Sequence, residues 1–283
     1  MAAAAHEQRV VVMRHGDRLD HAEPIWPANK PRPWDPPLTD AGLLRAWTVG
    51  KRIRAAAAAD GWAIHRVLVS PFLRCRQTAA QALAALCAVP DDAALLAIDD
   101  PANVPLDTSR LKCFGKSSFT TMLDEKVSIE YGLSEMMNAQ AMGIIVEKVA
   151  PSVKEWFPDL PELEADLPPE TIDHSAESLY PEVPKWGESI LEGRSRYASV
   201  IKALADKYPD ENLLLVTHGE GVGASVSYFE IGVEIYEVEY CAYSVLGRQV
   251  SRKPGEEGFT ADSLKVFTKT GTTGIQYAPA SQL

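Results

Sequence analysis

Two histidines and three arginines each stand at or just after the end of an apolar run of the sequence. They are Arg14, His15, Arg18, Arg74 and His218. Guanidinium groups bind phosphoryl oxygens through paired, charge-assisted hydrogen bonds, so a cluster of arginines predicts a phosphate pocket. A neutral histidine in such a pocket can attack phosphorus and carry the phosphoryl group until water removes it. Neighbouring positive charge lowers the pKa of a histidine and keeps its ring neutral, as a nucleophile must be.

Three apolar runs must position these residues. They cover residues 9–13, 65–70 and 212–218 and are rich in Val and Leu with little alternation. This composition is typical of parallel strands that are covered on both faces. In open α/β sheets, ligands bind outside the carboxyl ends of the strands. We therefore expect the five side chains to meet in one crevice at that edge of the sheet, where Gly16 lets the backbone approach a phosphate closely.

Helical patterns alternate with the apolar runs. The segments 38–59, 70–87 and 186–208 carry apolar residues at helical spacing. Ser70 as N-cap and Pro71 at the first helical position predict the start of the second of these helices. Strands that alternate with helices indicate an α/β sandwich with a mostly parallel sheet.

Two segments depart from this alternation. The proline-rich stretch 21–39 predicts an ordered loop. Residues 101–184 are irregular and broken by prolines, so we predict an insertion or cap on one edge of the sheet. The whole chain, residues 1–283, is predicted to form a single domain. Aromatic residues indicate that the insertion packs against the rest of the protein; they are Trp156, Phe157 and Tyr180.

The composition limits the class of protein. The chain has 283 residues and a formal net charge of −11, so a broad nucleic-acid interface is not expected. No apolar span suits a membrane helix, and residues 1–9 lack a secretory pattern and predict a frayed terminus. Four scattered cysteines without a CxxC pair favour a reducing compartment over a disulfide framework or a cysteine-rich zinc site. These features predict a cytoplasmic protein, with the nucleus as the other compartment.

Five blocks in order resemble the histidine phosphatase (phosphoglycerate mutase-like) superfamily. They are RHGDR, DPPLTDAG, SPFLRCRQTA, GLSE and VTHG, and the resemblance runs from about Arg9 to His218. The residues after RHG and the block PFLRCRQTA are similar to the group of the suppressor-of-T-cell-receptor-signalling phosphatases and ecdysteroid-phosphate phosphatase. The resemblance implies a three-layer α/β/α sandwich whose mostly parallel sheet has an antiparallel edge strand.

The resemblance also implies roles for single residues. His15 would be the phosphorylated nucleophile, and Arg14, Arg18, Arg74 and His218 would form the phosphate pocket. This metal-independent mechanism needs no cofactor, but it needs a general acid for the leaving alcohol.

Three glutamates are candidates for that acid. Glu135 lies in the GLSE block, which resembles the acid-bearing segment of the family, and it is the favoured candidate. Glu220, two residues after His218, resembles the acid of the phytase-like branch. An exposed acid favoured by a helix dipole is the structural alternative for Glu220. Glu130 is the third candidate.

Departures from the family bear on the substrate. Asp17–Arg18 follow RHG where cofactor-dependent phosphoglycerate mutases have an acid–serine pair, which favours phosphomonoester hydrolysis over mutase activity. Two tryptophans and four methionines could line an apolar substrate pocket or pack in the core. They are Trp26, Trp34, Met122, Met136, Met137 and Met142. An apolar pocket predicts an aryl, steroid-like or other small organic phosphate, or phosphotyrosine in a peptide. A homodimer is left open.

Two other functions fit parts of the sequence. The segment GEGVGA (219–224) matches the G-x-G-x-x-[GA] dinucleotide fingerprint, with Glu239 about twenty residues on as a ribose ligand. That interpretation predicts an NAD-binding oxidoreductase but leaves His15 and the arginines unexplained. A non-catalytic phosphoryl-binding module is the second alternative, because the same pocket could recognise a phosphorylated partner.

Overall fold

The computed structural model describes residues 4–22, 30–111, 126–252 and 258–282. Its strands are β1 (Ala4–Arg14), β2 (Arg66–Val69), β3 (Val127–Ile129), β4 (Leu213–Thr217), β5 (Val233–Val238), β6 (Tyr243–Arg252), β7 (Thr260–Ala261), β8 (Lys265–Val266) and β9 (Ile275–Pro279). Its helices are α1 (Leu19–Ala22), α2 (Asp40–Ala59), α3 (Leu73–Cys87), α4 (Asp92–Leu96), α5 (Ala139–Met142), α6 (Ile144–Val149), α7 (Leu160–Glu164), α8 (Ile190–Lys207) and α9 (Gly219–Ser227). Short 3₁₀ turns include η3 (Tyr131–Leu133).

The main sheet has the strand order β3-β2-β4-β1-β6-β7, and β8 also pairs with β6. Strands β1 to β4 pair in parallel, whereas β6 runs antiparallel to β1. The predicted fold class, a mostly parallel sheet with an antiparallel edge, is therefore confirmed. Strands β5 and β9 form a separate antiparallel pair.

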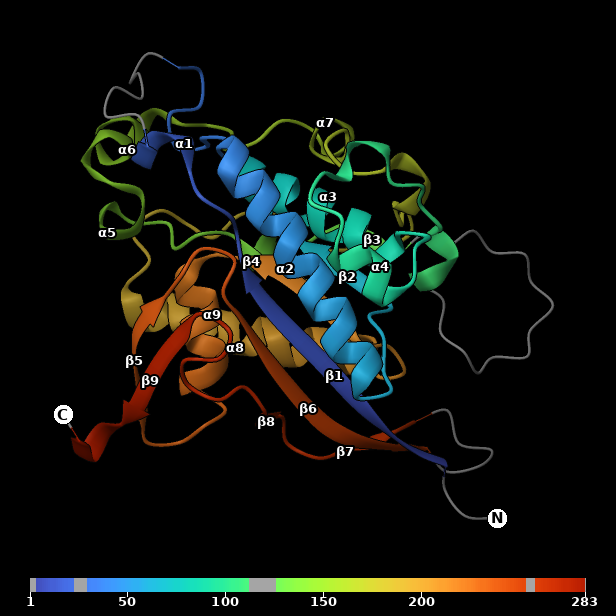
Figure 1. Cartoon of the computed structure of the whole chain (residues 1–283). Helices are drawn as coiled ribbons and strands as arrows, with labels where there is room; N and C mark the ends of the chain where they lie inside the picture. The colour runs from blue at the N-terminus through green and yellow to red at the C-terminus, as the bar shows by residue number, and fades with distance from the viewer. Residues whose placement is uncertain (1–3, 23–29, 112–125, 253–257, 283) are drawn as a thin grey trace.

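Helices cover both faces of the main sheet, with α2 in front of it and α8 behind it in the view of Figure 1. Alternate residues of β1 enter two different cores. Val11 and Met13 belong to the core that includes residues of α2 and α3, and Val10 and Val12 belong to the core that includes residues of α8 and α9. Burial on both faces explains why the apolar run of β1 shows no polar alternation.

Two element boundaries differ from the prediction. Residues 4–9 are not frayed, because β1 begins at Ala4 and pairs with β6 as far as Arg252. This alanine-rich start carries no strand pattern of its own, so its order depends on a partner that is distant in sequence. Helix α3 begins at Leu73 with Phe72 at its N-cap, and not at Ser70. The hydroxyl of Ser70 contacts a histidine instead, as described below.

The segment predicted as an insertion packs against the sheet and its helices. It contributes β3, which pairs with β2 in the main sheet. Trp156 stacks on Trp186, and Phe157 packs edge-on against Phe72 at the start of α3. No helix in the described part of the chain is long and apolar enough to cross a membrane. The cysteines there are free and buried, namely Cys75, Cys87 and Cys241, and Cys113 lies outside the described residues.

Candidate active site

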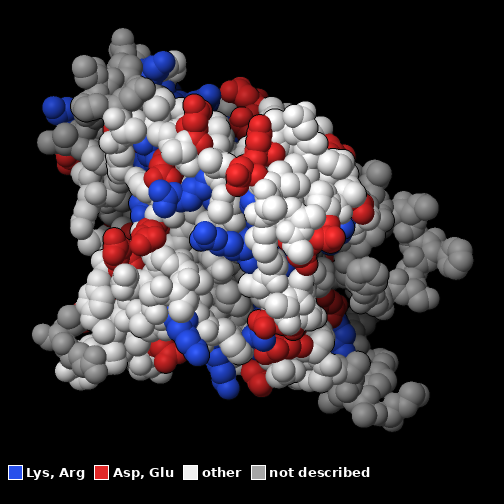
Figure 2. Space-filling view, viewed as in Figure 1, with Lys and Arg blue, Asp and Glu red and all other residues white. Residues whose placement is uncertain are grey.

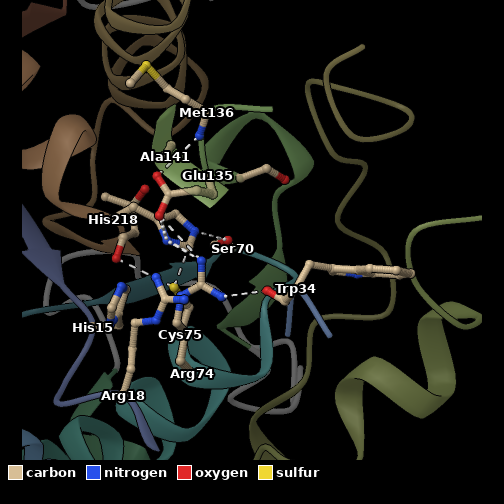
Figure 3. A network of polar contacts seen from close by, with 12 residues as sticks. His15, Arg18, Trp34, Ser70, Arg74, Cys75, Glu135, Met136, Ala141 and His218 are labelled. Atoms are coloured by element: carbon tan, nitrogen blue, oxygen red, sulfur yellow. Dashed lines mark hydrogen bonds and ion pairs between the residues drawn. The ribbon is translucent and has the colours of Figure 1, made fainter. Parts of the chain in front are cut away.

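The carboxyl ends of β1, β2 and β4 bring the predicted side chains together. His15 follows β1, His218 follows β4, and Arg74 lies in the first turn of α3 after β2. Figure 3 shows His15, Arg18, Arg74, Glu135 and His218 converging on one small region. The five side chains predicted from the strand ends thus share one site, and Glu135 joins them from the loop after η3.

The ring of His15 is buried and meets the ring of His218 edge-on, with 5.3 Å between the ring centroids. Its Nδ1 lies 2.8 Å from the carbonyl oxygen of Gly16. Because a carbonyl oxygen only accepts, Nδ1 carries the hydrogen and Nε2 keeps its lone pair. Burial and then the positive charge of Arg74 hold the pKa of His15 well below its usual value. The ring is therefore neutral at pH 7.

Glycine is required next to this histidine. A Cβ on Gly16 would lie 2.7 Å from the carbonyl oxygen of Gly42 in α2. The backbone N–H of Gly16 donates to Oγ1 of Thr78 at 2.9 Å. The close approach of α2 and the hydrogen bond from Gly16 to Thr78 of α3 together fix the backbone that carries His15.

His218 is buried between a carboxylate and a hydroxyl group. Its Nδ1 lies 3.1 Å from Oε2 of Glu135, and its Nε2 lies 2.9 Å from Oγ of Ser70. Burial lowers the pKa of His218 to about 4, although Glu135 acts in the opposite direction. A neutral ring whose Nδ1–H donates to Glu135 leaves Nε2 to accept from Ser70. Ser70 was missed as a site residue because its place before a helix predicted a cap.

Glu135 is buried and contacts both His218 and Arg74, with 3.3 Å between its Oε2 and Nη2 of Arg74. Burial by itself would raise the pKa of this carboxyl group, but His218, Arg74 and Arg18 outweigh it and hold the pKa well below its usual range. Glu135 is therefore a carboxylate in the ligand-free protein. Its position, between a histidine and the arginines, is that of a group able to exchange a proton with a bound ester.

The other two candidate acids have different surroundings. The buried carboxylate of Glu130 accepts hydrogen bonds from the backbone N–H groups of Gly132, Leu179 and Tyr180. These bonds give Glu130 a structural role. Glu220, in the first turn of α9, is half-exposed and forms an ion pair with Arg194 at 2.7 Å.

The three arginines present more positive charge than their protein partners balance. Arg18 binds Asp20 through two hydrogen bonds of 2.7 and 2.9 Å. Arg14 donates to the carbonyl oxygen of Val238 and lies 4.2 Å from the centre of the Tyr240 ring. In Arg14 and Arg74, Nε has no hydrogen-bond partner within the described residues. These groups retain capacity for an anion.

Tyr240 is a further site residue that the sequence did not indicate. Its ring lies beside both Arg14 and His15, with 5.8 Å between the Tyr240 and His15 ring centroids. Its hydroxyl is 2.6 Å from Nδ1 of His21 in α1. Since Tyr240 is distant in sequence from β1, only the folded chain reveals this contact.

A cavity of about 980 Å³ opens in front of His15. It is bounded by α5 and α6 on one side and by β5 on another, and Met142 contributes to its wall. The apolar pocket predicted from tryptophans and methionines is therefore only partly right. Met136 and Met137 are buried in the cores, and Trp34 packs against Trp156, because aromatic and thioether groups fill core space equally well. Trp26 and Met122 lie outside the described residues.

The glycine-rich segment 219–224 forms most of α9. A Cβ on Gly221 would lie 2.9 Å from Cγ2 of Thr217, and one on Gly219 would lie 3.4 Å from Nε of Arg14. Close packing thus accounts for these two glycines without a dinucleotide.

Ligand atoms of His15, Glu135 and His218 lie within 4.8 Å of one another, a spacing that a metal ion could use. Arg74, however, places its guanidinium group 3.3 Å from both Glu135 and His218. A divalent cation at this point would be repelled by the neighbouring guanidinium charge, whereas an oxyanion would be attracted.

Comparison with known proteins shows which family the chain matches. A family model described as the Histidine phosphatase superfamily (branch 1) matches residues 6–96 and 121–253. The ecdysone phosphate phosphatase of Bombyx mori, solved in complex with tungstate, is similar in structure, with a TM-score of 0.50, 21% identity, and coverage of 94% of this chain and 95% of that chain. A phosphoglycerate mutase from Bacillus anthracis str. Sterne has a TM-score of 0.46 and 14% identity, with 92% of this chain and 93% of that chain covered. No curated protein matches the sequence.

Proposed function

Since this chain belongs to the histidine phosphatase superfamily, we propose that it hydrolyses phosphate monoesters through a phosphohistidine at His15. One observation carries the proposal. The neutral, buried ring of His15 has its Nε2 lone pair free, in a site where Arg14, Arg18 and Arg74 supply positive charge. That arrangement suits a nucleophile that meets a phosphoryl dianion.

In the first step, Nε2 of His15 attacks phosphorus and the bond to the ester oxygen breaks. The arginines hold the non-bridging oxygens, whose charge they are placed to neutralise. Glu135 gives its proton to the departing alcohol oxygen, so the alcohol leaves neutral. The products of this step are the alcohol, the Glu135 carboxylate and a phosphoryl group on His15.

In the second step, water attacks the phosphoryl group and the bond from phosphorus to Nε2 breaks. Glu135 now accepts a proton from the water, so the same carboxyl group serves as acid and then as base. Inorganic phosphate leaves and His15 returns to its neutral form. His218, hydrogen-bonded to Glu135, orients that carboxyl group through both steps.

Glu135 must be protonated before the first step, although it is a carboxylate in the free protein. A phosphoryl dianion beside Arg18 and Arg74 offsets the charges that lower its pKa. A negative neighbour also disfavours the carboxylate form. Substrate binding therefore raises the pKa of Glu135, and the carboxyl group becomes protonated before the first step.

The surroundings of Asp17 and Arg18 favour hydrolysis over phosphoryl transfer within a mutase. Asp17 is bound by Arg45 through Nε at 2.8 Å and does not line the cavity, whereas Arg18 does line it. Arg18, which stands where cofactor-dependent phosphoglycerate mutases have a serine, thus adds positive charge to the phosphate pocket.

The size and lining of the cavity support a substrate with a sizeable organic part. A volume of about 980 Å³ far exceeds a phosphoryl group, and Val233, Ile235 and Met142 add apolar surface. We propose an aryl, steroid-like or other small organic phosphate, or phosphotyrosine. The Bombyx mori phosphatase of similar fold binds tungstate, a tetrahedral oxyanion that mimics phosphate.

A direct test uses 4-nitrophenyl phosphate with the wild-type protein and the variant His15→Ala. We expect turnover by the wild type and none by the variant. Acid-labile, base-stable labelling from a ³²P-phosphate ester should also disappear in the variant. Equal residual activity in the two proteins would overturn the nucleophile assignment. Binding of phosphate or vanadate without any turnover would instead favour the phosphoryl-binding module.

A further inference from the structure

The cavity in front of His15 carries charges of both signs. Three arginines and five carboxylates of the described residues line it: Arg14, Arg18, Arg194, Asp20, Glu135, Glu220, Glu234 and Glu237. Figure 2 shows basic and acidic side chains close together around the middle of this face. A pocket that served only to attract anions would not place more carboxylates than arginines around its opening.

Most of these charges are already paired. Arg18 binds Asp20 at 2.7 Å, and Arg194 binds Glu220 at 2.7 Å. Glu135 contacts Arg74, which lies behind the cavity wall. Three charged groups of the lining remain without an ion pair among the described residues, and they are Arg14, Glu234 and Glu237.

Both of these glutamates belong to β5. In a regular strand, residues three positions apart point to opposite faces. The register of β5 against β9 shifts between Ile235 and Glu237, and a bulge of this kind moves the later side chains to the other face. Glu234 and Glu237 are consequently both exposed on one side of β5 at the edge of the cavity, whereas Ile235 packs toward α9. The end of β5 is tied to the phosphate site because Val238 accepts a hydrogen bond from Arg14.

An anion site next to Glu135 is indicated independently by Arg74. Its side chain is 1% exposed, and its Nε has no hydrogen-bond partner in the described part of the chain. A ligand that satisfies the whole cavity must therefore place a negative group near Arg74 and Arg14. It must also place a positive or hydrogen-bond-donating group beside β5.

We propose that the preferred substrates are phosphate monoesters whose alcohol part carries a positively charged group, such as a primary or quaternary ammonium. This inference rests on the proposed hydrolase function and specifies its substrate class. The phosphoryl group binds among the arginines, the hydrocarbon part contacts Ile235 and Met142, and the cation lies beside Glu234 and Glu237. Esters with a second anionic group are disfavoured, because two carboxylates without ion-pair partners face that group.

Three para-substituted phenyl phosphates of the same shape test this inference. Their substituents are methyl, aminomethyl and carboxylate, so the distal group is neutral, positive or negative. We expect kcat/KM to be about tenfold higher for the aminomethyl ester than for the carboxylate ester, and this preference should weaken as salt is added. The variants Glu234→Gln and Glu237→Gln should each reduce the ratio, and the double variant should abolish it.

The matched control is Glu230→Gln, which neutralises an exposed glutamate that does not line the cavity. It should leave the ratio unchanged. Equal rates for the two charged esters would overturn the inference, and so would an equal loss of preference in Glu230→Gln. In either case, turnover of the methyl ester would still support the hydrolase function. If no ester is turned over, the hydrolase fails. Binding of 4-(aminomethyl)benzylphosphonate and 4-carboxybenzylphosphonate to the same variants then decides the charge preference by itself.

Discussion

The arginines of the phosphate pocket act on the two reacting groups of the site in opposite directions. Together with burial, which has the larger effect, the positive charge of Arg74 and Arg14 lowers the pKa of His15 and favours the neutral nucleophile. Against the effect of burial, His218 and then Arg74 and Arg18 lower the pKa of Glu135, which disfavours the protonated acid. A bound phosphoryl dianion satisfies both requirements. Its negative charge raises the pKa of Glu135, and His15 is already neutral when it binds. In the ligand-free site, His15 is thus already in its nucleophilic form, whereas Glu135 is not yet protonated.

Replacement of Glu135 by Gln should show which step the carboxyl group serves. For an alkyl phosphate, whose alcohol needs a proton to leave, we expect kcat to fall about 10²- to 10³-fold. For 4-nitrophenyl phosphate, whose leaving group is stable as an anion, the loss in the first step should be much smaller. The measurement is kcat for both esters, together with the burst of nitrophenolate, and Glu220→Gln is the control. A larger alkyl-ester defect in Glu220→Gln would transfer the acid role to that residue.

The pH dependence of kcat/KM reports the protonation state of His15 in the free enzyme. The pKa of His15 is held well below the usual value, first by burial and then by Arg74, so the acidic limb of the kcat/KM profile that reports His15 should lie well below the ordinary histidine value of about 6.5. Arg74→Gln removes the neighbouring charge that contributes most to lowering this pKa after burial. The acidic limb of the kcat/KM profile should then move to higher pH, toward the ordinary histidine value of about 6.5. The same ester is used for both proteins, since its own ionisation then contributes equally, and an unmoved limb would contradict the proposed field effect.

At the scale of elements, helix α8 holds the segment that carries Glu135. Arg196 donates to the carbonyl oxygens of Gly132 and Ser134 at 2.7 and 3.1 Å, and the hydroxyl of Tyr197 donates to Ser134 at 2.6 Å. Arg196 is itself buried and forms an ion pair with Glu188 at 2.7 Å. These bonds satisfy backbone groups that lack partners in regular structure. We infer that Arg196 is a positioning residue for the acid.

Arg196→Met should therefore affect both stability and chemistry. Loss of a buried ion-pair partner costs about 3 kcal/mol of unfolding free energy. The displaced Glu135 should lower kcat for an alkyl phosphate more than for 4-nitrophenyl phosphate. Arg194→Met is the control on the same helix, because its half-exposed pair with Glu220 contributes about 1 kcal/mol or less. Urea unfolding and the kcat ratio of the two esters are the measurements, and an unchanged ratio in Arg196→Met would leave it a purely structural residue.

The elements that the sequence predicts well are those with a local signal. The apolar runs became β1, β2 and β4, because full burial on both faces leaves little room for polar residues. Strand β6 and the first residues of β1 were not predicted, since each has mixed composition and is ordered by pairing with the other. Ser70, Tyr240 and the glutamates of β5 were missed for a related reason. Their roles arise from contacts between distant segments, and no spacing within the chain encodes them.

At the scale of the whole molecule, the buried histidines of the active site make the free energy of unfolding depend on pH. His15 and His218 are neutral in the folded protein, and the pKa of His218 is lowered to about 4. An unfolded chain restores both to the ordinary value of about 6.5. As the pH falls below that value, the unfolded state binds protons that the buried rings exclude, so stability falls as the pH is lowered. The site geometry that favours nucleophilic attack therefore makes the protein sensitive to acid.

Paired carboxylates add to this sensitivity at lower pH. Glu211 and Asp173 both bind Arg66 at the start of β2, and hydrogen bonds from Arg66 help to lower their pKa values even though burial acts in the other direction. Groups with a lowered carboxyl pKa stabilise the fold fully above the unfolded value of about 4, and this contribution is lost as the pH falls through the folded value. As the pH is lowered, the buried histidines thus reduce the stability of the fold first, and the paired carboxylates reduce it at lower pH.

Urea unfolding between pH 7.5 and pH 5 should resolve the contribution of the histidines. At pH 5, about 1.5 units below the ordinary histidine pKa, the exclusion of a proton from His218, whose pKa is about 4, costs about 2 kcal/mol of unfolding free energy. His218→Asn removes this contribution, so the loss of stability across this range should be smaller by about 2 kcal/mol, whatever the variant does to stability at pH 7.5. Glu211→Gln should leave this range unchanged and alter the slope only below about pH 5. An identical slope in the wild type and in His218→Asn would show that His218 is not held neutral by the fold.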